Sequence, residues 1–265
     1  MTWLGIQGFV AVNGVPGVRD AALMRYARHL LLPEIGIAGQ EKLAASHCLL
    51  IGVGGLGCSV ATQLCLSGLG QVSIADGDQV ELSNLQRQPL FTSADIGVDK
   101  VRCAQARLQA MNPDCKVHPV ARRLQAGEIA ELAGSADLLI DCSDNYATRY
   151  ACNDAARSTH CPLISGAAVG WRGLVVAFAN DAPDTACYSC VFPPDTTAAD
   201  ENCTGGAVFA ALPAIVGAWQ AVAAIQTLTG SGARWANQLL TIDAINLSMR
   251  RSALRRDLRC PTCGG

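Results

Sequence analysis

Two groups of residues in this chain have the types and the spacing that chemistry needs. One is a pair of Cys-x-x-Cys motifs, Cys187 with Cys190 and Cys260 with Cys263. Two such motifs can bring four thiolates to one tetrahedral zinc ion, and a closed four-sulfur site leaves no position for a substrate. The sequence therefore predicts a structural zinc site. A redox dithiol is the alternative, but we expect neither motif to open a helix after a buried strand, as that chemistry prefers.

The second group has side chains that suit phosphate. The segment 82–91, LSNLQRQPLF, gathers one guanidinium and several amides, on Asn84, Gln86, Arg87 and Gln88. A planar guanidinium with neighbouring amides can grip phosphate oxygens, and a solvated turn is the alternative. Lys100 follows at the start of an amphipathic segment, and it is one of three lysines, at 42, 100 and 116.

Two acidic residues follow predicted strands. Asp76 ends the segment QVSIAD, 19 positions beyond Gly57. Nucleotide-binding folds hold a ribose hydroxyl there, and a capping residue in an acidic turn is the alternative. Asp144 lies in DCSDN after the strand-like DLLIDC. Its carboxylate suits a Mg²⁺ ion that bridges triphosphate oxygens, although it could equally cap the following helix.

The element that must position these groups is the segment 47–57, HCLLIGVGGLG. An apolar run ends in Gly52, Gly54, Gly55 and Gly57, and a helical pattern of apolar residues begins at Leu56. This order is typical of a nucleotide-binding strand, turn and helix, in which glycines let the backbone approach a phosphate at the helix N-terminus. A plain tight turn is the alternative.

Strand-like and helix-like segments then alternate through residue 160. A further strand, CPLISGAAV, is followed by GLVVAFAN, which we expect to pair antiparallel, and by two closing strands, QLLTIDA and NLSMRRS. The predicted fold class is α/β: a Rossmann-like doubly wound sheet, mostly parallel, with antiparallel C-terminal strands and zinc knuckles. Two further helices are expected, one from Asp20 through Leu30 and an apolar one over residues 207–230.

The composition of the chain limits the classes of function that it can have. Half of the 265 residues are hydrophobic and 16% are charged, which supports a sizeable core. The net charge of −2 gives no electrostatic reason for a nucleic acid or membrane partner. Because the opening segment lacks a basic n-region, we expect a cytoplasmic protein whose 13 cysteines are reduced or metal-bound.

These motifs together resemble the ubiquitin-activating-type adenylyltransferases of bacterial sulfur transfer, the ThiF/MoeB/HesA family. In chain order they are RYARHLLLPEIG, GVGGLG, D-x-D-x-V-x-L-S-N-L-Q-R-Q, D-x-G-x-x-K, NPD, DCSDN and the two Cys-x-x-Cys motifs. The resemblance implies an enzyme that uses ATP and Mg²⁺ to adenylate the C-terminal glycine carboxylate of a small ubiquitin-like sulfur carrier ending in Gly-Gly. It also implies a single adenylation domain over 20–265, with a nucleotide half (about 20–160) and a carrier and zinc half (about 161–265). Residues 1–19 are expected to form a flexible arm.

The resemblance also assigns roles to residues. It implies that the nucleotide is bound by Gly52, Gly54, Gly55, Gly57, Asp76, Ser83, Asn84, Leu85, Gln86, Arg87, Lys100, Asp144 and Asn145. Asn84, Arg87 and Lys100 are implied to serve the transition state, and Asp144 to hold Mg²⁺. Arg28 is implied to reach the nucleotide of a second subunit, so we expect a homodimer.

Two members of the family are candidates. The ending MRRSALRRDLRCPTCGG and the segment ENCTGGAV look more like the thiamine-pathway enzyme, ThiF, than the molybdopterin-synthase adenylyltransferase, MoeB. In the thiamine enzyme the cysteine that matches Cys203 forms an acyl-disulfide with the carrier, whereas in the molybdopterin relative it is a loop residue. Because no rhodanese-like extension follows, we expect a separate sulfur donor, a cysteine desulfurase or a rhodanese-type protein.

Two other functions remain as alternatives. The glycine turn and Asp76 would also fit an NAD-dependent dehydrogenase, but the LSNLQRQ segment and the cysteine motifs argue against it. A non-catalytic scaffold for a ubiquitin-like protein would not need Arg87, Lys100 and Asp144 together. Adenylation is the function that the sequence favours.

Overall fold

The structure is a computed structural model that describes residues 20–180, 185–194, 207–231 and 235–264. The predicted arm, residues 1–19, and Cys203 lie outside these ranges. Strands of the described part form one sheet: β1 (His47–Ile51), β2 (Gln71–Ala75), β3 (Lys116–Val120), β4 (Leu138–Asp141), β5 (Leu163–Val169), β6 (Arg172–Phe178), β7 (Gln238–Asp243) and β8 (Ser248–Ala253).

The strand order is β3-β2-β1-β4-β5-β6-β7-β8. Strands β3, β2, β1, β4 and β5 are parallel, and β6, β7 and β8 each pair antiparallel with the preceding strand. The order reverses between β1 and β4, and the crevice at such a switch point is where open α/β sheets bind ligands. The predicted fold class, including its antiparallel C-terminal strands, is confirmed.

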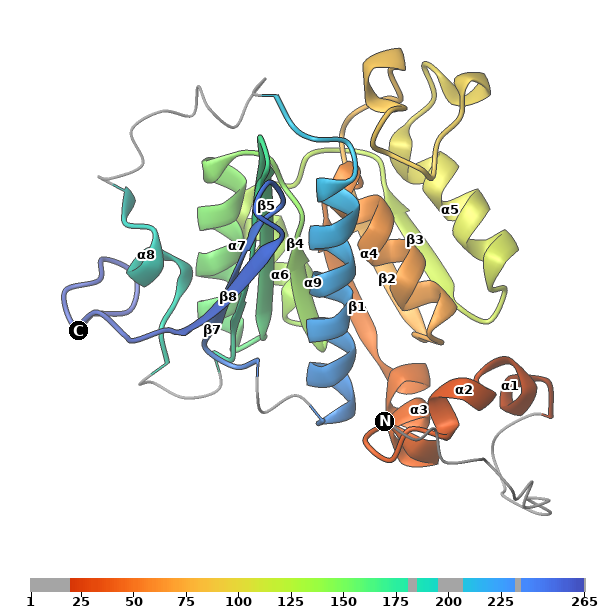
Figure 1. Cartoon of the computed structure of the whole chain (residues 1–265), viewed down its shortest axis with the longest axis horizontal. Coiled ribbons are helices and arrows are strands. Elements are labelled where there is room, and N and C mark those ends of the chain that lie inside the picture. Colours follow the sequence, from red (N-terminus) through yellow and green to blue (C-terminus); the bar gives the residue numbers. More distant parts are fainter. Residues whose placement is uncertain (1–19, 181–184, 195–206, 232–234, 265) are drawn as a thin grey trace.

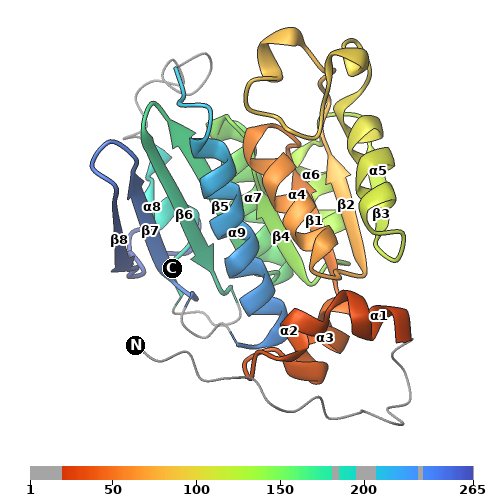
Figure 2. The same cartoon turned by 45° about the vertical axis from the view of Figure 1, so that its right-hand side comes forward.

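Helices cover both faces of the sheet (Figure 2). One face carries α4 (Gly55–Leu66), α5 (Lys100–Met111) and α9 (Leu212–Thr229), and the other carries α6 (Ala126–Ala133), α7 (Tyr146–Thr159) and the one-turn helix α8 (Tyr188–Val191). Three short helices, α1 (Asp20–Arg25), α2 (Ala27–Leu30) and α3 (Gly36–Ala45), lie at the edge where β1 begins (Figure 1). Two 3₁₀ turns, η1 (Leu82–Asn84) and η2 (Ser93–Asp95), lie in the connection from β2 to α5.

Strand β1 shows why its sequence is apolar without alternation. Cys48 and Leu50 face the core on the side of α4, and Leu49 and Ile51 face the core on the side of α7. All four side chains are buried. A parallel strand covered by helices on both faces must be apolar at every position.

Two expectations about helices need correction. The single helix expected from Asp20 through Leu30 is instead α1 and α2, which are separated at Tyr26. The Tyr26 side chain is buried over Gly68, and its hydroxyl accepts a hydrogen bond from Asn112 Nδ2 at 2.8 Å. Anchoring this ring in the core takes precedence over helix continuity.

The apolar helix α9 begins at Leu212, later than the sequence suggested, with Pro213 in its first turn. It has the length and composition of a membrane-crossing helix, but half of its residues are buried. It lies on the sheet beside α4 (Figures 1 and 2). At Gly217 a Cβ would come within 2.5 Å of the Leu56 carbonyl oxygen, so this glycine permits the close contact between α9 and α4.

The contact between the β1 turn and α4 gives a testable expectation. A Cβ on Gly57 would lie 2.0 Å from the Gly52 carbonyl oxygen, which belongs to the backbone and cannot yield easily. Replacing Gly57 by Ala should lower the free energy of unfolding by about 3 kcal/mol. Gly127→Ala in α6 is the matched control, because a Cβ there meets no atom within 4 Å. Urea unfolding of both variants checks this, and equal stabilities would contradict it.

Candidate functional site

A cavity of about 610 Å³ opens at the carboxyl ends of β1, β2 and β4. Most residues assigned to nucleotide binding line it: Gly52, Gly54, Gly55, Asp76, Asn84, Gln86, Arg87, Lys100, Asp144 and Asn145. Three do not line it. Gly57 is packed beneath the turn, the Ser83 side chain is exposed beside Glu81, and Leu85 packs against the core. Ten of the thirteen residues that the resemblance assigned to nucleotide binding therefore line one cavity.

The glycine turn is held by backbone contacts and by Asp76. Gly52 has a φ of +89°, which favours glycine, and a Cβ there would lie 2.9 Å from the Cys142 carbonyl oxygen at the end of β4. The carboxylate of Asp76 accepts the Val53 N–H and the Asp78 N–H, each at 2.8 Å. Burial raises the pKa of Asp76 despite these bonds and the nearby lysine. Asp76 thus holds the glycine turn through the Val53 N–H, a contact that the sequence did not suggest. Its bond to the Asp78 N–H is the capping role that the sequence left open as the alternative.

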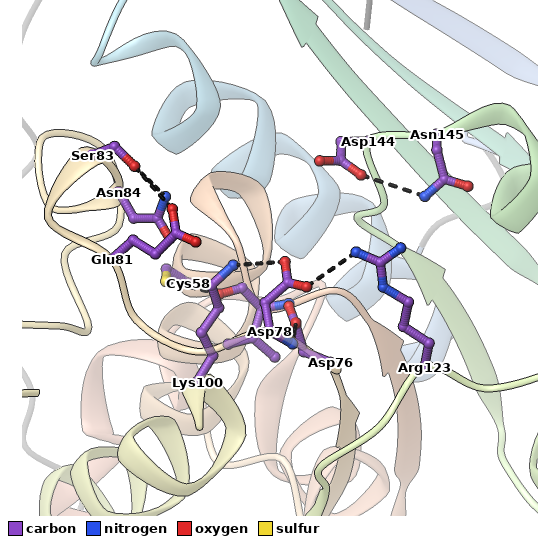
Figure 3. A network of polar contacts seen from close by, with 11 residues as sticks. Cys58, Asp76, Asp78, Glu81, Ser83, Asn84, Lys100, Arg123, Asp144 and Asn145 are labelled. Atoms are coloured by element: carbon purple, nitrogen blue, oxygen red, sulfur yellow. Dashed lines mark hydrogen bonds and ion pairs between the residues drawn. The ribbon is translucent and has the colours of Figure 1, made fainter. Parts of the chain in front are cut away.

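Lys100 is a buried cation held by one carboxylate. It is the first residue of α5 and is 5% exposed, and its Nζ lies 3.1 Å from Asp78 Oδ2. Arg123 Nη2 approaches the other oxygen of Asp78 at 3.1 Å (Figure 3). Burial tends to raise the pKa of Asp78, but the two cations outweigh burial and hold this pKa below its usual range. A cation fixed in such a poorly solvated place acts strongly on a nearby anion.

The segment 82–91 folds into a compact turn. Arg87 Nη1 donates to the Ser83 carbonyl at 2.9 Å, and the buried Asn84 donates to Ser83 Oγ at 3.3 Å. Arg87 is half-buried at the cavity, whereas Gln86 is exposed and Gln88 is buried. Residues of this turn line the cavity, as a phosphate-binding segment must, although Ser83 and Gln86 are exposed, as in a solvated turn.

Asp144 lies across the cavity from the Lys100–Asp78 pair (Figure 3). The helix cap predicted as its alternative role belongs to Asn145, whose Oδ1 accepts the Thr148 N–H at 2.9 Å. The exposed Asp144 carboxylate is therefore not used as the cap, and among the described residues it accepts one long hydrogen bond, of 3.4 Å, from Asn145 Nδ2. The hard oxygens of Asp144 at the cavity fit a divalent cation.

A buried carboxylate, that of Asp141, holds the loop that follows β4 and carries Asp144. Asp141 is fully buried at the end of β4, and it accepts hydrogen bonds from Ser143 N (2.9 Å), Ser143 Oγ (2.6 Å) and Ser165 Oγ (2.6 Å). The bonds to Ser143 hold the residue immediately before Asp144, and the bond to Ser165 ties Asp141 to β5.

Three arginines that line the cavity, Arg122, Arg123 and Arg149, were not found from the sequence, and neither was Asp78. Arg122 and Arg123 lie two and three residues beyond the end of β3, so the end-of-strand rule that selected Asp76 could have found them. Arg149 lies inside α7, where sequence gives no such signal. Its Nη2 donates to the Ser143 carbonyl at 3.1 Å, and its guanidinium lies 5.4 Å from the centre of the Tyr146 ring.

Arg28 does not contribute to the cavity of its own chain. It is exposed on α2, at the edge of the sheet opposite the cavity (Figures 1 and 2). Its predicted action on a second subunit's nucleotide stays a prediction.

The four predicted zinc ligands do come together. The Sγ–Sγ distances are 3.8 Å for Cys187–Cys190, 3.6 Å for Cys187–Cys260 and 3.3 Å for Cys190–Cys263, and all four sulfurs lie within 4.8 Å of one another. Tetrahedral zinc with bonds of about 2.3 Å places its sulfurs about 3.8 Å apart. The Asp257 N–H points to Cys190 Sγ at 3.4 Å, a contact that supports a thiolate.

One argument against a redox site was wrong in detail. Cys187 directly precedes α8, so the first motif does open a short helix. The convergence of all four thiols is the better evidence, because a redox dithiol needs only two.

Known proteins match this chain along most of its length. A model of the ThiF family matches residues 26–263. A sulfur carrier protein adenylyltransferase of Thermus thermophilus is 41% identical, over 91% of this chain and 91% of the relative. The ThiS adenylyltransferase of Escherichia coli is 38% identical, over 94% and 98%. MOCS3 of Drosophila virilis, named an adenylyltransferase and sulfurtransferase, is 37% identical over 91% of this chain and 53% of the relative.

Solved structures share the fold. Escherichia coli MccB with ATP has a TM-score of 0.78 at 22% identity, over 91% of this chain and 73% of that chain. PaaA has a TM-score of 0.78 at 21% identity, over 95% and 79%. The relatives confirm the predicted resemblance and the adenylyltransferase class. The chain belongs to the ThiF family.

Proposed function

We propose that this protein adenylates the C-terminal glycine carboxylate of a ubiquitin-like sulfur-carrier protein, with ATP as the second substrate. The observation that carries the proposal is the buried Lys100, fixed by Asp78 at 3.1 Å beside the glycine turn and Arg87. The names of the relatives, sulfur carrier protein adenylyltransferases, supply the substrate class.

The chemistry needs no general base. A carboxylate is already ionised near pH 7, so its oxygen can attack the α-phosphorus directly. A bond forms between that oxygen and phosphorus as the bond from phosphorus to the bridging oxygen breaks, and pyrophosphate departs. Negative charge grows on the phosphoryl oxygens and on the leaving group. Lys100 and Arg87 are preorganised cations that stabilise this charge.

Other residues bind and orient the nucleotide. The N–H groups at the start of α4, after Gly54, favour a phosphate there. Asp76 is proposed to accept a ribose hydroxyl through the lone pairs that the backbone leaves free. Asp144 would hold Mg²⁺, which neutralises triphosphate charge when bound.

For the carrier, we propose the thiamine-pathway type, with the molybdopterin type as the alternative. The ThiS adenylyltransferase of Escherichia coli and MOCS3 of Drosophila virilis have nearly the same identity to this chain, 38% and 37%.

The proposal has three further parts. The protein would form a homodimer in which Arg28 acts across subunits, and a separate protein would donate the sulfur. Cys203, which lies outside the described residues, would form the acyl-disulfide with the carrier.

We also propose that the four cysteines bind structural zinc. The cluster joins α8 to the C-terminal segment, and the Arg256 guanidinium donates to the Cys263 carbonyl beside it. It lies outside the cavity lining, so its role would be to hold these segments together.

Removing the buried cation tests the chemistry. Lys100→Ala should lower the rate of carrier-dependent ATP–pyrophosphate exchange by about 10²–10³-fold, the loss expected for one oxyanion partner. Lys116→Ala is the control, because Lys116 is exposed at the start of β3, at the opposite edge of the sheet. Equal rates for the two variants would count against the proposed role of Lys100.

Offering the carriers separately tests the substrate. Exchange with the thiamine-type carrier alone is the expected result. Exchange with only the molybdopterin-type carrier would replace the thiamine assignment, and no exchange with either would reject adenylation of these carriers.

Metal analysis tests the cysteine cluster. The purified chain should contain about one zinc per chain by plasma mass spectrometry, and Cys263→Ser should lose it together with several kcal/mol of stability. Cys103→Ser in α5 should keep the metal, since Cys103 lies outside the cluster. A metal-free wild-type protein that unfolds normally would refute the zinc site.

A further inference from the structure

All three polar groups of Ser143 are held by two buried charged side chains. Its N–H and its hydroxyl donate to Asp141 Oδ1, at 2.9 Å and 2.6 Å, and its carbonyl accepts a hydrogen bond from Arg149 Nη2 at 3.1 Å. Asp141 is fully buried and Arg149 is 5% exposed. Since Ser143 directly precedes Asp144, these bonds fix the backbone that carries the proposed magnesium ligand.

The backbone is also fixed on both sides of this pair of residues. Before it, Cys142 N donates to the Ile51 carbonyl of β1 at 2.8 Å. After it, Asn145 caps α7 by accepting the Thr148 N–H at 2.9 Å. The Asp144 side chain is nevertheless exposed and lines the cavity. The loop therefore presents one exposed carboxylate on a backbone that has little freedom to move.

Arg149 reaches back from α7 to the residue that lies two positions before this helix begins. Its guanidinium lies 5.4 Å from the centre of the Tyr146 ring. A planar guanidinium can lie over a ring and donate to a carbonyl at the same time, which the flexible stem and ammonium of a lysine do not match. The contacts of Arg149 thus fix a position and do not only supply a charge.

Stability of the fold does not by itself require these charged groups. Burying a carboxylate and a guanidinium costs free energy that their own interactions often do no more than return. Neutral groups also hold this loop, as the amide oxygen of Asn145 does at the start of α7. What a charged group adds is a shorter and stronger bond, such as the 2.6 Å bond between Ser143 Oγ and Asp141. The benefit is a precisely placed backbone.

We propose that Asp141 and Arg149 are positioning residues, which hold the Ser143 backbone so that the Asp144 carboxylate is already placed for Mg²⁺ when the nucleotide enters. The proposal rests on the proposed function, in which Asp144 holds the metal, and adds two residues on which metal binding depends. A ligand group that is fixed beforehand loses less conformational freedom on binding, so the affinity for the metal rises.

A direct contact between Arg149 and the triphosphate is the alternative, because Arg149 also lines the cavity. Positioning is favoured because the guanidinium already donates to Ser143 and lies near the Tyr146 ring. ATP binding without a metal separates the two. A cation that touches the triphosphate contributes to that binding, whereas a residue that only places Asp144 does not.

The test is the gain in ATP affinity when Mg²⁺ is added, measured by calorimetry in EDTA and in excess Mg²⁺, without carrier. In Asp141→Asn and in Arg149→Met we expect this gain to fall by about tenfold or to disappear, a loss typical of groups that orient a metal ligand. Ser143→Ala removes only the hydroxyl bond and should reduce the gain by about threefold. ATP affinity in EDTA should not fall in any of the three variants.

Arg157→Met and Asp137→Asn are the matched controls. Arg157 lies in the last turn of α7 and donates to Thr185 Oγ1, and Asp137 precedes β4 and accepts the His47 N–H. Both substitutions alter a hydrogen bond, but neither residue lines the cavity. Their gain in ATP affinity with Mg²⁺ should equal that of the wild type.

An unchanged gain in Asp141→Asn and Arg149→Met, even with lower stability to urea, would overturn the proposal and leave both residues a packing role. If either variant does not fold, Ser143→Ala decides the question. A fall in ATP affinity in EDTA for Arg149→Met would overturn the positioning role of Arg149 and assign it to the triphosphate.

The wild type separates this proposal from the proposed reaction. A wild-type protein that binds ATP equally well in EDTA and in Mg²⁺ would overturn the proposal, because Asp144 would then hold no metal. The expected gain and its loss in the variants, in a protein that exchanges pyrophosphate with neither carrier, would uphold the positioning role and reject the reaction.

Discussion

The site depends on how closely three backbones approach at two glycines. The Gly52 carbonyl would lie 2.0 Å from a Cβ at Gly57, and the Cys142 carbonyl lies 2.9 Å from where a Cβ at Gly52 would be. Only residues without a side chain let β1, β4 and α4 meet this closely. The meeting brings the start of α4 and the loop that follows β4 to one cavity, so the phosphate-binding helix end and Asp144 face the same space.

The charged side chains at the cavity are arranged around one carboxylate, that of Asp78. Asp78 pairs with Lys100 and Arg123, and Asp76 holds the turn that precedes Asp78 through the Asp78 N–H. Asp76 and Asp78 lie close enough to repel each other, but Asp76 accepts two backbone N–H groups, Asp78 pairs with two cations, and Lys100 attracts both carboxylates. The ion pair with Asp78 thus holds the buried Lys100 side chain at the cavity.

Sequence predicted the fold well because its signals were local. The apolar β1, the glycines after it and the acid after β2 each follow from neighbouring residues, and so do both cysteine motifs. Prediction from the sequence failed where a side chain contacts a residue far away along the chain. Tyr26 breaks a helix to reach Asn112, and Arg123 reaches Asp78 across 45 positions. The choice between Asp144 and Asn145 as helix cap depended on one side-chain orientation, which periodicity does not contain.

The cysteine cluster and the cavity are separate, yet α7 connects them. Near the cluster, Asn153 Oδ1 accepts the Tyr188 N–H at 2.8 Å, and the Tyr150 hydroxyl donates to the Phe192 carbonyl at 3.0 Å. At its other end α7 begins beside Asn145 at the cavity. A metal that fixed α8 would also hold the outer side of α7. It would support the loop of Asp144 through a helix rather than through any contact with the reacting groups, so the cluster would act on catalysis only through the stability of this face of the sheet.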